Sequence, residues 1–153
     1  MLEARAVLRA HVPVLIGLQV RPDQRDLMTA NVVTLAEAPY EPGARVWGLW
    51  SGEEAVGLLG MQNTAEITEP EPEDDLGAAY LWRLMIGAGH QGRGHGRAAM
   101  GLAEAVARGW GFRRMVLGVS PEAHSNQGFY EALGYRATGR MAWGDRMMER
   151  DLF

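Results

Sequence analysis

The stretch from Tyr80 to Met100, with the sequence YLWRLMIGAGHQGRGHGRAAM, constrains the fold more than any other part of the chain. Up to Ile86 it is rich in aromatic and β-preferring side chains, and glycines follow, which predicts a strand that ends in a loop. Beyond Gly96 apolar residues recur every three or four positions, which predicts an amphipathic helix that ends near Gly109 or Gly111. We therefore expect a strand that passes through a short loop directly into a helix.

The loop between these elements has the composition of a phosphate-binding turn, Gln91-Gly92-Arg93-Gly94-His95-Gly96-Arg97. Its alternating glycines leave backbone N–H groups unshielded at the start of a helix, where partial positive charge and unpaired donors favour anions. Arg93 and Arg97 add formal charge, and His95 is expected to contribute a backbone donor and not a catalytic side chain. A pyrophosphate suits this arrangement. The alternative interpretation is a flexible connection whose glycines allow tight packing.

Two common nucleotide motifs do not fit the loop. It lacks the Gly-Lys-Ser/Thr ending of a P-loop, and it lacks both the G-x-G-x-x-G order and the acidic residue about 20 positions later that a dinucleotide-binding fold uses. The spacing of Gln91, Gly94 and Gly96 instead resembles the signature of the GNAT superfamily of acetyl-CoA-dependent N-acyltransferases. A second segment, FYEALGY at 129–135, is similar to the F-Y-x-x-L-G-F segment of that family. The resemblance covers nearly the whole chain.

Length and composition limit the classes of protein to consider. With 153 residues, of which 47% are hydrophobic and 22% charged, residues 1–153 suit a single domain around one core. No apolar run approaches the ~20 residues that span a bilayer, and the N-terminus lacks a signal-peptide layout, so we expect a cytoplasmic protein without membrane contacts. A net charge of −4 argues against a broad nucleic-acid surface and is compatible with a cationic substrate. Because the chain has no cysteine, acyl transfer must be direct or use another nucleophile.

The rest of the chain alternates between predicted strands and helices. The expected elements are a strand at 2–8, a short helix at 13–18, a helix from Pro22 or Asp23 that finishes before Pro39, a hairpin at 46–50 and 55–61, a solvated acidic loop at 64–77, a strand at 114–120, a helix from about His124 to Leu133, and strands at 135–140 and 146–153. The GNAT resemblance implies an α/β (α+β) fold. Its central sheet is mixed and mostly antiparallel, has six to seven strands flanked by helices, and splays between the fourth and fifth strands, where the pantetheine arm of the cofactor enters.

The resemblance also implies roles for individual residues. The backbone around Met85 and Ile86 would hold the pantetheine and polarise the thioester carbonyl, and the Gln91 to Arg97 loop would bind the pyrophosphate of acetyl-CoA. Many family members place an asparagine where this chain has Ala123, so Asn126, or the backbone around Ser125, is expected to take its place. Tyr130 is the candidate general acid, because a phenol with a pKa of ~10 suits the protonation of a thiolate leaving group. The alternative is that the Tyr130 ring only packs between helix and sheet.

The sequence indicates the acceptor of the acetyl group less clearly than it indicates the cofactor. The helix at 30–38, the strand LWRLMI at 81–86 and the residues Thr138-Gly139 before Gly144-Asp145 look like bacterial spermine/spermidine N-acetyltransferases, which implies a polyamine acceptor. An alkyl ammonium with a pKa near ~10 must lose a proton before it attacks. Some polyamine acetyltransferases carry a glutamate in place of Trp82, and tryptophan cannot act as that base. The expected acceptor contacts are Glu37, Glu41 and Trp82, and Asp74, Asp75 and Glu149 are further acidic candidates unless they are plain surface charges.

Several alternatives remain open from the sequence. The acceptor is a polyamine, an amino acid, an antibiotic amine or a protein N-terminus, and a non-catalytic CoA-binding module would share the same loop. A metal site built on His90 and His95 lacks a carboxylate at helical spacing, so no metal is expected. The resemblance also implies a homodimer, paired through sheet edges or the C-terminal strand.

Overall fold

The computed structural model describes residues 1–122 and 124–153, and within them seven strands form one mixed sheet in the order β1-β2-β3-β4-β5-β7-β6. The parallel β4–β5 pair stands among otherwise antiparallel neighbours. The strands are β1 (Leu2–Ala6), β2 (Ala44–Ser51), β3 (Glu54–Gln62), β4 (Ala79–Ile86), β5 (Arg114–Val119), β6 (Arg136–Ala142) and β7 (Asp145–Asp151). This arrangement confirms the predicted mixed, mostly antiparallel α/β sheet.

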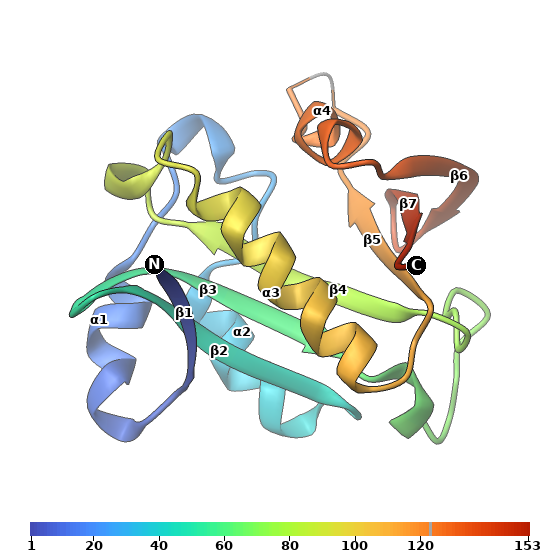
Figure 1. Ribbon diagram of the computed structural model, residues 1–153, viewed down its shortest axis with the longest axis horizontal. Helices are drawn as coiled ribbons and strands as arrows, with labels where there is room; N and C mark the ends of the chain where they lie inside the picture. The colour runs from blue at the N-terminus through green and yellow to red at the C-terminus, as the bar shows by residue number, and fades with distance from the viewer. Residues whose placement is uncertain (123) are drawn as a thin grey trace.

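Helices cover both faces of the sheet. Helix α3 (His95–Gly109) crosses the front of β3 and β4, whereas α2 (Asn31–Glu37) lies behind the sheet and α4 (Gln127–Ala132) follows β5 (Figure 1). Helix α1 (Val12–Gly17) packs beside α2. Short 3₁₀ turns are η1 (Arg9–His11), η2 (Pro22–Gln24), η3 (Ala38–Tyr40), η4 (Thr64–Glu66) and η5 (Ala88–His90). Among the residues described, no helix is both long and apolar enough to cross a membrane.

Strand β3 separates two apolar clusters. Its consecutive residues Leu58 and Leu59 are both fully buried, yet they belong to different clusters because successive side chains of a strand point to opposite faces. Leu59 packs with Met100 of α3, and Leu58 packs with Leu15 of α1 and Met85 of β4. The uninterrupted apolar sequence of this strand therefore reflects burial on both faces.

Most predicted boundaries agree with the structure to within a few residues, but two helix starts were wrong. The predicted helix from Pro22 or Asp23 is only the 3₁₀ turn η2, because Ala30 is extended (φ −62°, ψ 145°) and α2 begins at Asn31. The buried Asn31 side chain donates a 2.9 Å hydrogen bond to the Leu15 carbonyl oxygen, which fixes this start against α1. Helix α4 begins at Gln127 and not at His124.

The sheet splits between its fourth and fifth strands, as the resemblance implied. Strands β4 and β5 pair only at Ala79↔Met115, Tyr80↔Val116 and Leu81↔Leu117, although β4 continues to Ile86. Beyond Leu81 the two strands separate, and β5 turns towards α4 (Figure 1). One edge of the second half of β4 is consequently left without a strand partner.

Candidate active site

A β-bulge in β4 directs two neighbouring side chains into one cavity. Gly60 of β3 lies opposite Arg83, whereas Met61 lies opposite Leu81, so Trp82 is the extra residue. A bulge of this kind re-aims side chains next to it. Trp82 and Arg83 both line the same cavity, and the Arg83 guanidinium lies 4.4 Å from the centre of the Trp82 ring.

Beyond the bulge, every second residue of β4 directs its backbone N–H and C=O groups towards the opening of the sheet. Gly87 donates a 2.8 Å hydrogen bond to the Val56 carbonyl oxygen, and Met85 lies opposite Leu58. Because alternate residues of an antiparallel strand bond to one neighbour, the backbone groups of Met85 face β3, and those of Leu84 and Ile86 face the side that β5 has left. Met85 also lines the opening, but its backbone groups pair with β3 and so do not face the pantetheine path that the sequence analysis expected. Leu84 was missed by the sequence analysis, although strand alternation carries the signal.

Two glycines of the loop before α3, and one in the first turn of α3, occupy positions where a side chain would be unfavourable. Gly92 and Gly94 have φ values of +77° and +82°, a left-handed conformation that other residues adopt only at a cost. A Cβ atom at Gly96 would lie 3.2 Å from the Phe129 ring. The loop and the first turn of α3 line a cavity of about 390 Å³ together with the end of β4 and with α4. We call this the cradle cavity. Open space surrounds Gly92 and Gly94, so a ligand could approach their backbone closely.

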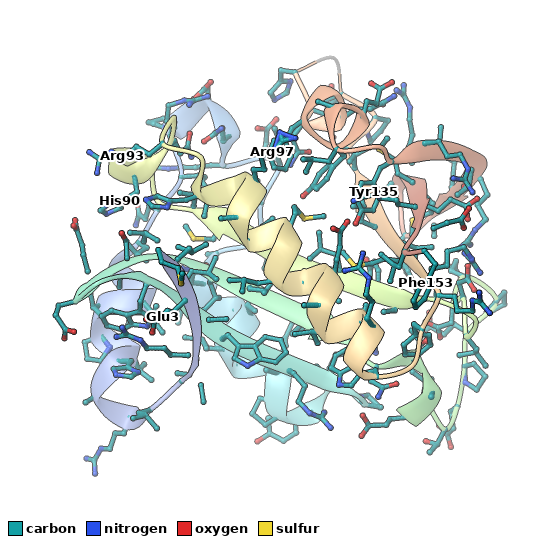
Figure 2. All side chains as sticks on the ribbon, viewed as in Figure 1. Glu3, His90, Arg93, Arg97, Tyr135 and Phe153 are labelled. Carbon is teal, nitrogen blue, oxygen red and sulfur yellow. The ribbon has the colours of Figure 1, made fainter. Side chains whose placement is uncertain are left out.

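The polar side chains of the loop divide between supporting the loop and facing the cavity. Gln91 donates from Nε2 to the Ile86 carbonyl oxygen at 3.0 Å and to Gln24 Oε1 at 2.9 Å, so its side chain ties the loop to β4. His95 and Arg97 line the cradle cavity. Arg93 extends from the outer side of the loop, whereas Arg97 lies at the start of α3 on the side nearest α4 (Figure 2).

Tyr130 and Asn126 lie where the cradle cavity meets a smaller cavity of about 130 Å³ inside the split. We call this second space the split cavity. Tyr130 is buried, and its burial raises the pKa of the hydroxyl well above its ordinary value. The Asn126 carbonyl oxygen accepts the N–H of Phe129, but the Asn126 side chain makes no capping bond and so stays available to the two cavities. Ala123, the position of the missing motif asparagine, lies outside the described residues.

A third cavity, of about 480 Å³, carries six carboxylates and three aromatic side chains. We call it the acidic cavity. Its carboxylates are those of Glu37, Glu41, Glu69, Glu71, Asp74 and Asp145, and its aromatic residues are Tyr80, Trp82 and Trp143. Glu37 pairs with Arg83 at 3.3 Å, and Trp143 Nε1 donates a 3.2 Å hydrogen bond to Glu71. The predicted acceptor residues Glu37, Glu41 and Trp82 thus come together in one space.

Comparison with known proteins decides the family. A sequence model described as the Acetyltransferase (GNAT) family matches residues 14–135, which is most of the chain. The chain belongs to the GNAT acetyltransferase family. It is therefore an acetyltransferase, and the cradle cavity lies where the family signature occurs in the sequence.

Solved structures share the fold of this chain. An acetyltransferase from Thermus thermophilus is 25% identical, with a TM-score of 0.68 and coverage of 99% of this chain and 97% of that one. The PaiA N-acetyltransferase from Thermoplasma acidophilum, solved with coenzyme A, is 14% identical, with a TM-score of 0.70 and 99% coverage of both chains. A Bacillus subtilis acetyltransferase, also solved with CoA, is 12% identical, with a TM-score of 0.67 and coverage of 99% and 98%. Among curated proteins, no sequence matches this chain.

The three cavities of this GNAT enzyme meet along the split in the sheet. The residues that the split cavity shares with the cradle cavity are Met28, Leu84, Met85, Asn126 and Tyr130, and those that it shares with the acidic cavity are Tyr80, Trp82, Arg83 and Asp145. A group held at the loop before α3 and a group held among the carboxylates would therefore approach one another beside Tyr130. This is the geometry that a direct transfer between two bound reactants requires.

The remaining acidic candidates separate into two groups. Asp74 lines the acidic cavity of the GNAT enzyme, whereas Asp75 and Glu149 bond to Arg114 at 2.7 Å and 3.1 Å and hold the base of the split together. The hydrogen bond from Arg114 lowers the pKa of Asp75. A carboxylate that is ionised and paired in this way is a poor proton acceptor. Glu69, Glu71 and Asp145 also line the cavity but were not singled out as acceptor residues. No local motif marks Glu69 or Glu71, and Asp145 entered the sequence analysis only as part of the Gly144-Asp145 pair.

Proposed function

We propose that this GNAT enzyme transfers the acetyl group of acetyl-CoA to a primary amine of a small polycation, with spermidine or spermine as the first candidate. The acceptor attacks the thioester directly, and Tyr130 is the general acid. The observation that carries the acceptor assignment is the acidic cavity, whose six carboxylates lie at the far end of the split from the cradle cavity.

Acetyl-CoA fits the cradle cavity on the chemistry of the residues present. Backbone N–H groups of Gly92 to Gly96, at the N-terminus of the 15-residue helix α3, favour the pyrophosphate, and Arg97 adds a positive charge. The backbone groups of Leu84 and the N–H of Ile86 supply donors and an acceptor for the amide groups of the pantetheine arm, whereas the Ile86 carbonyl oxygen already accepts a hydrogen bond from Gln91. Acetyl-CoA supplies the activated acyl group, and this chain supplies orientation and proton transfer.

The protonation state of Tyr130 fits a proton donor and not a base, although its raised pKa makes it a weaker acid than an exposed tyrosine. Burial disfavours the phenolate, so the hydroxyl keeps its proton at neutral pH. A neutral phenol beside the split can protonate a departing thiolate. Tyr130 lines both the split cavity and the cradle cavity, so a reactant in either space can approach its side chain.

The acidic cavity favours a cation with several amino groups. Arg83 neutralises Glu37, and the other five carboxylates of the cavity belong to Glu41, Glu69, Glu71, Asp74 and Asp145. An ammonium chain would pair with these carboxylates and pack against Tyr80, Trp82 and Trp143 by cation–π contact. An α-amino acid would bring its own carboxylate into the same negative field, which disfavours it.

The testing experiment measures CoA release from acetyl-CoA mixed in turn with spermidine, spermine, a lysine peptide, an aminoglycoside and glycine. A thiol-reactive dye gives no background from this protein, because the chain contains no cysteine. We expect the highest kcat/KM with the polyamines, and KM values for them that rise with salt. A preference for the peptide or for glycine would overturn the polyamine assignment. Tight acetyl-CoA binding without CoA release from any amine would indicate a binding module.

A further inference from the structure

One carboxylate of the acidic cavity differs from the others in its position. Asp145 begins β7 at the tight connection from β6, where it lies opposite Ala142. Among the described residues, it alone of the acidic side chains lines both the acidic cavity and the split cavity. Tyr130 lines that same split cavity. Asp145 therefore lies between the space for a cationic acceptor and the candidate general acid.

Gly118 makes the room that Asp145 occupies. A Cβ atom on Gly118 would lie 3.0 Å from both Cβ and Oδ2 of Asp145, which is tighter than most Cβ contacts, so Asp145 would have to shift. Gly118 follows Leu117, the last residue of β5 that pairs with β4. The missing side chain thus lets the Asp145 carboxylate lie over β5 at the point where the sheet opens.

The charged and titratable groups around Asp145 leave it without a fixed cation. Tyr80 and Arg83 face it from β4, Glu71 and Asp74 from the acidic loop, and Tyr130 from α4. Arg83 is hydrogen-bonded to Glu37 and to the Trp82 carbonyl oxygen. The adjacent Arg146 bonds to Gln127 and to the Pro121 carbonyl oxygen. Within the described residues no ion pair reaches Asp145, and burial raises the pKa of its carboxyl group.

We infer that Asp145 receives the ammonium group of the acceptor and takes its proton before attack, an inference that rests on the proposed function. The Asp145 carboxylate accepts one proton from R–NH₃⁺, which leaves R–NH₂. The amine nitrogen forms a C–N bond to the thioester carbonyl carbon while the C–S bond breaks. Tyr130 gives its proton to the departing sulfur and recovers one from the nitrogen. Asp145 releases its proton to solvent, so the products are the acetamide, CoA-SH and one H⁺.

The variant Asp145→Asn tests this role through the pH dependence of kcat/KM for spermidine. We expect a loss of about 100-fold near neutral pH, typical of a removed general base. The wild-type profile should level off once Asp145 is ionised, whereas the variant should gain about tenfold per pH unit towards the ammonium pKa of ~10. Calorimetry on CoA-saturated protein should show at least about tenfold weaker spermidine binding, because one partner of a desolvated ion pair is lost. Acetyl-CoA affinity should not change.

Two further variants separate a catalytic role from a structural one. Gly118→Ala keeps the carboxylate but displaces it, so we expect a partial loss of turnover with the wild-type form of pH profile. Asp151→Asn makes the same chemical change at the other end of β7, where the carboxylate is exposed and pairs with Arg136, and it should behave as wild type. An Asp145→Asn profile that matches wild type overturns the inference alone. Absence of turnover by the wild type with every amine overturns the proposed function and this inference together.

Discussion

The Tyr135 hydroxyl donates a 2.8 Å hydrogen bond to the buried carboxylate of Glu104. Glu104 lies on α3, and the same carboxylate accepts a 2.8 Å bond from Arg150 of β7. Helix α3 packs on the first half of the sheet, so this cluster connects the two halves that the split separates. The width of the opening beside Tyr130 therefore depends on polar contacts as well as on apolar packing.

Replacement of Tyr135 by phenylalanine should destabilise the fold by about 1–2 kcal/mol, because a buried hydrogen bond to a charged group is lost while Arg150 still pairs with Glu104. Urea unfolding followed by circular dichroism would measure the change. Tyr40→Phe is the matched control, since Tyr40 is 87% exposed and should show no change. Equal stability of Tyr135→Phe and wild type would contradict a stabilising role for this contact.

Stability should fall as the pH rises above about 10. Burial raises the pKa of Tyr130. The pKa of Tyr135 is raised mainly by burial and, to a smaller extent, by the hydrogen bond to Glu104. Unfolded tyrosines ionise near ~10, so folding retains protons that the unfolded chain loses above that pH. The stabilisation by these two tyrosines is fully present below pH ~10. It is lost as the pH rises from ~10 through their higher folded-state pKa values. Thermal melts between neutral and alkaline pH should show this slope, and Tyr130→Phe and Tyr135→Phe should each reduce it.

Tyr130→Phe should lower kcat for spermidine acetylation by about 100-fold or more, as expected for a removed general acid. Acetyl-CoA affinity should stay within a factor of about two, because the ring and its packing against Phe129 and Tyr135 remain. Steady-state kinetics and calorimetry would measure the two quantities on one preparation. Retained turnover would remove the tyrosine from the acid role.

The double variant Gly94→Arg, Gly96→Arg should weaken acetyl-CoA binding at least about tenfold, because side chains would fill the cradle and strain a left-handed residue. Gly101→Ala is the control within the same helix. Gly101 has open space around it, so this change should leave binding intact and stabilise the fold by about 0.5–1 kcal/mol. Unchanged calorimetric affinity of the double variant would refute the pyrophosphate assignment.

Removal of two charges from the acidic cavity by Glu41→Gln and Glu69→Gln should raise KM for spermidine several-fold and leave kcat nearly unchanged, since distant carboxylates hold and attract the cation without touching the reacting atoms. The salt dependence of KM should decrease as well. Glu53→Gln with Asp151→Asn removes the same charge from exposed positions outside the cavities and serves as the control. A fall in kcat at constant KM would place these two residues in the chemistry.

The sequence predicted those strands and helices whose hydrophobic pattern lies within a short stretch of the chain. The strand before the glycine loop, the helix after it and the β2–β3 hairpin each follow from side chains a few positions apart. The start of α2 was not readable, because it depends on a bond from Asn31 to Leu15 of another helix. The contacts of the Gln91 side chain were not readable either. The sequence placed Gln91 among the cofactor contacts, whereas in the structure its side chain donates hydrogen bonds to Ile86 and Gln24 and supports the loop.

The sequence by itself determined the fold class, the cradle and the candidate acid, because the glycine loop and the FYEALGY segment are continuous in the chain. Only the tertiary structure revealed the acidic cavity that we propose for the acceptor. The bulge at Trp82 turns Arg83 into the acidic cavity, and the missing side chain of Gly118 admits Asp145 from β7. These residues converge through strand register and packing between distant segments. Local spacing carries no record of such contacts, because it reports only which face of its own strand or helix a residue occupies.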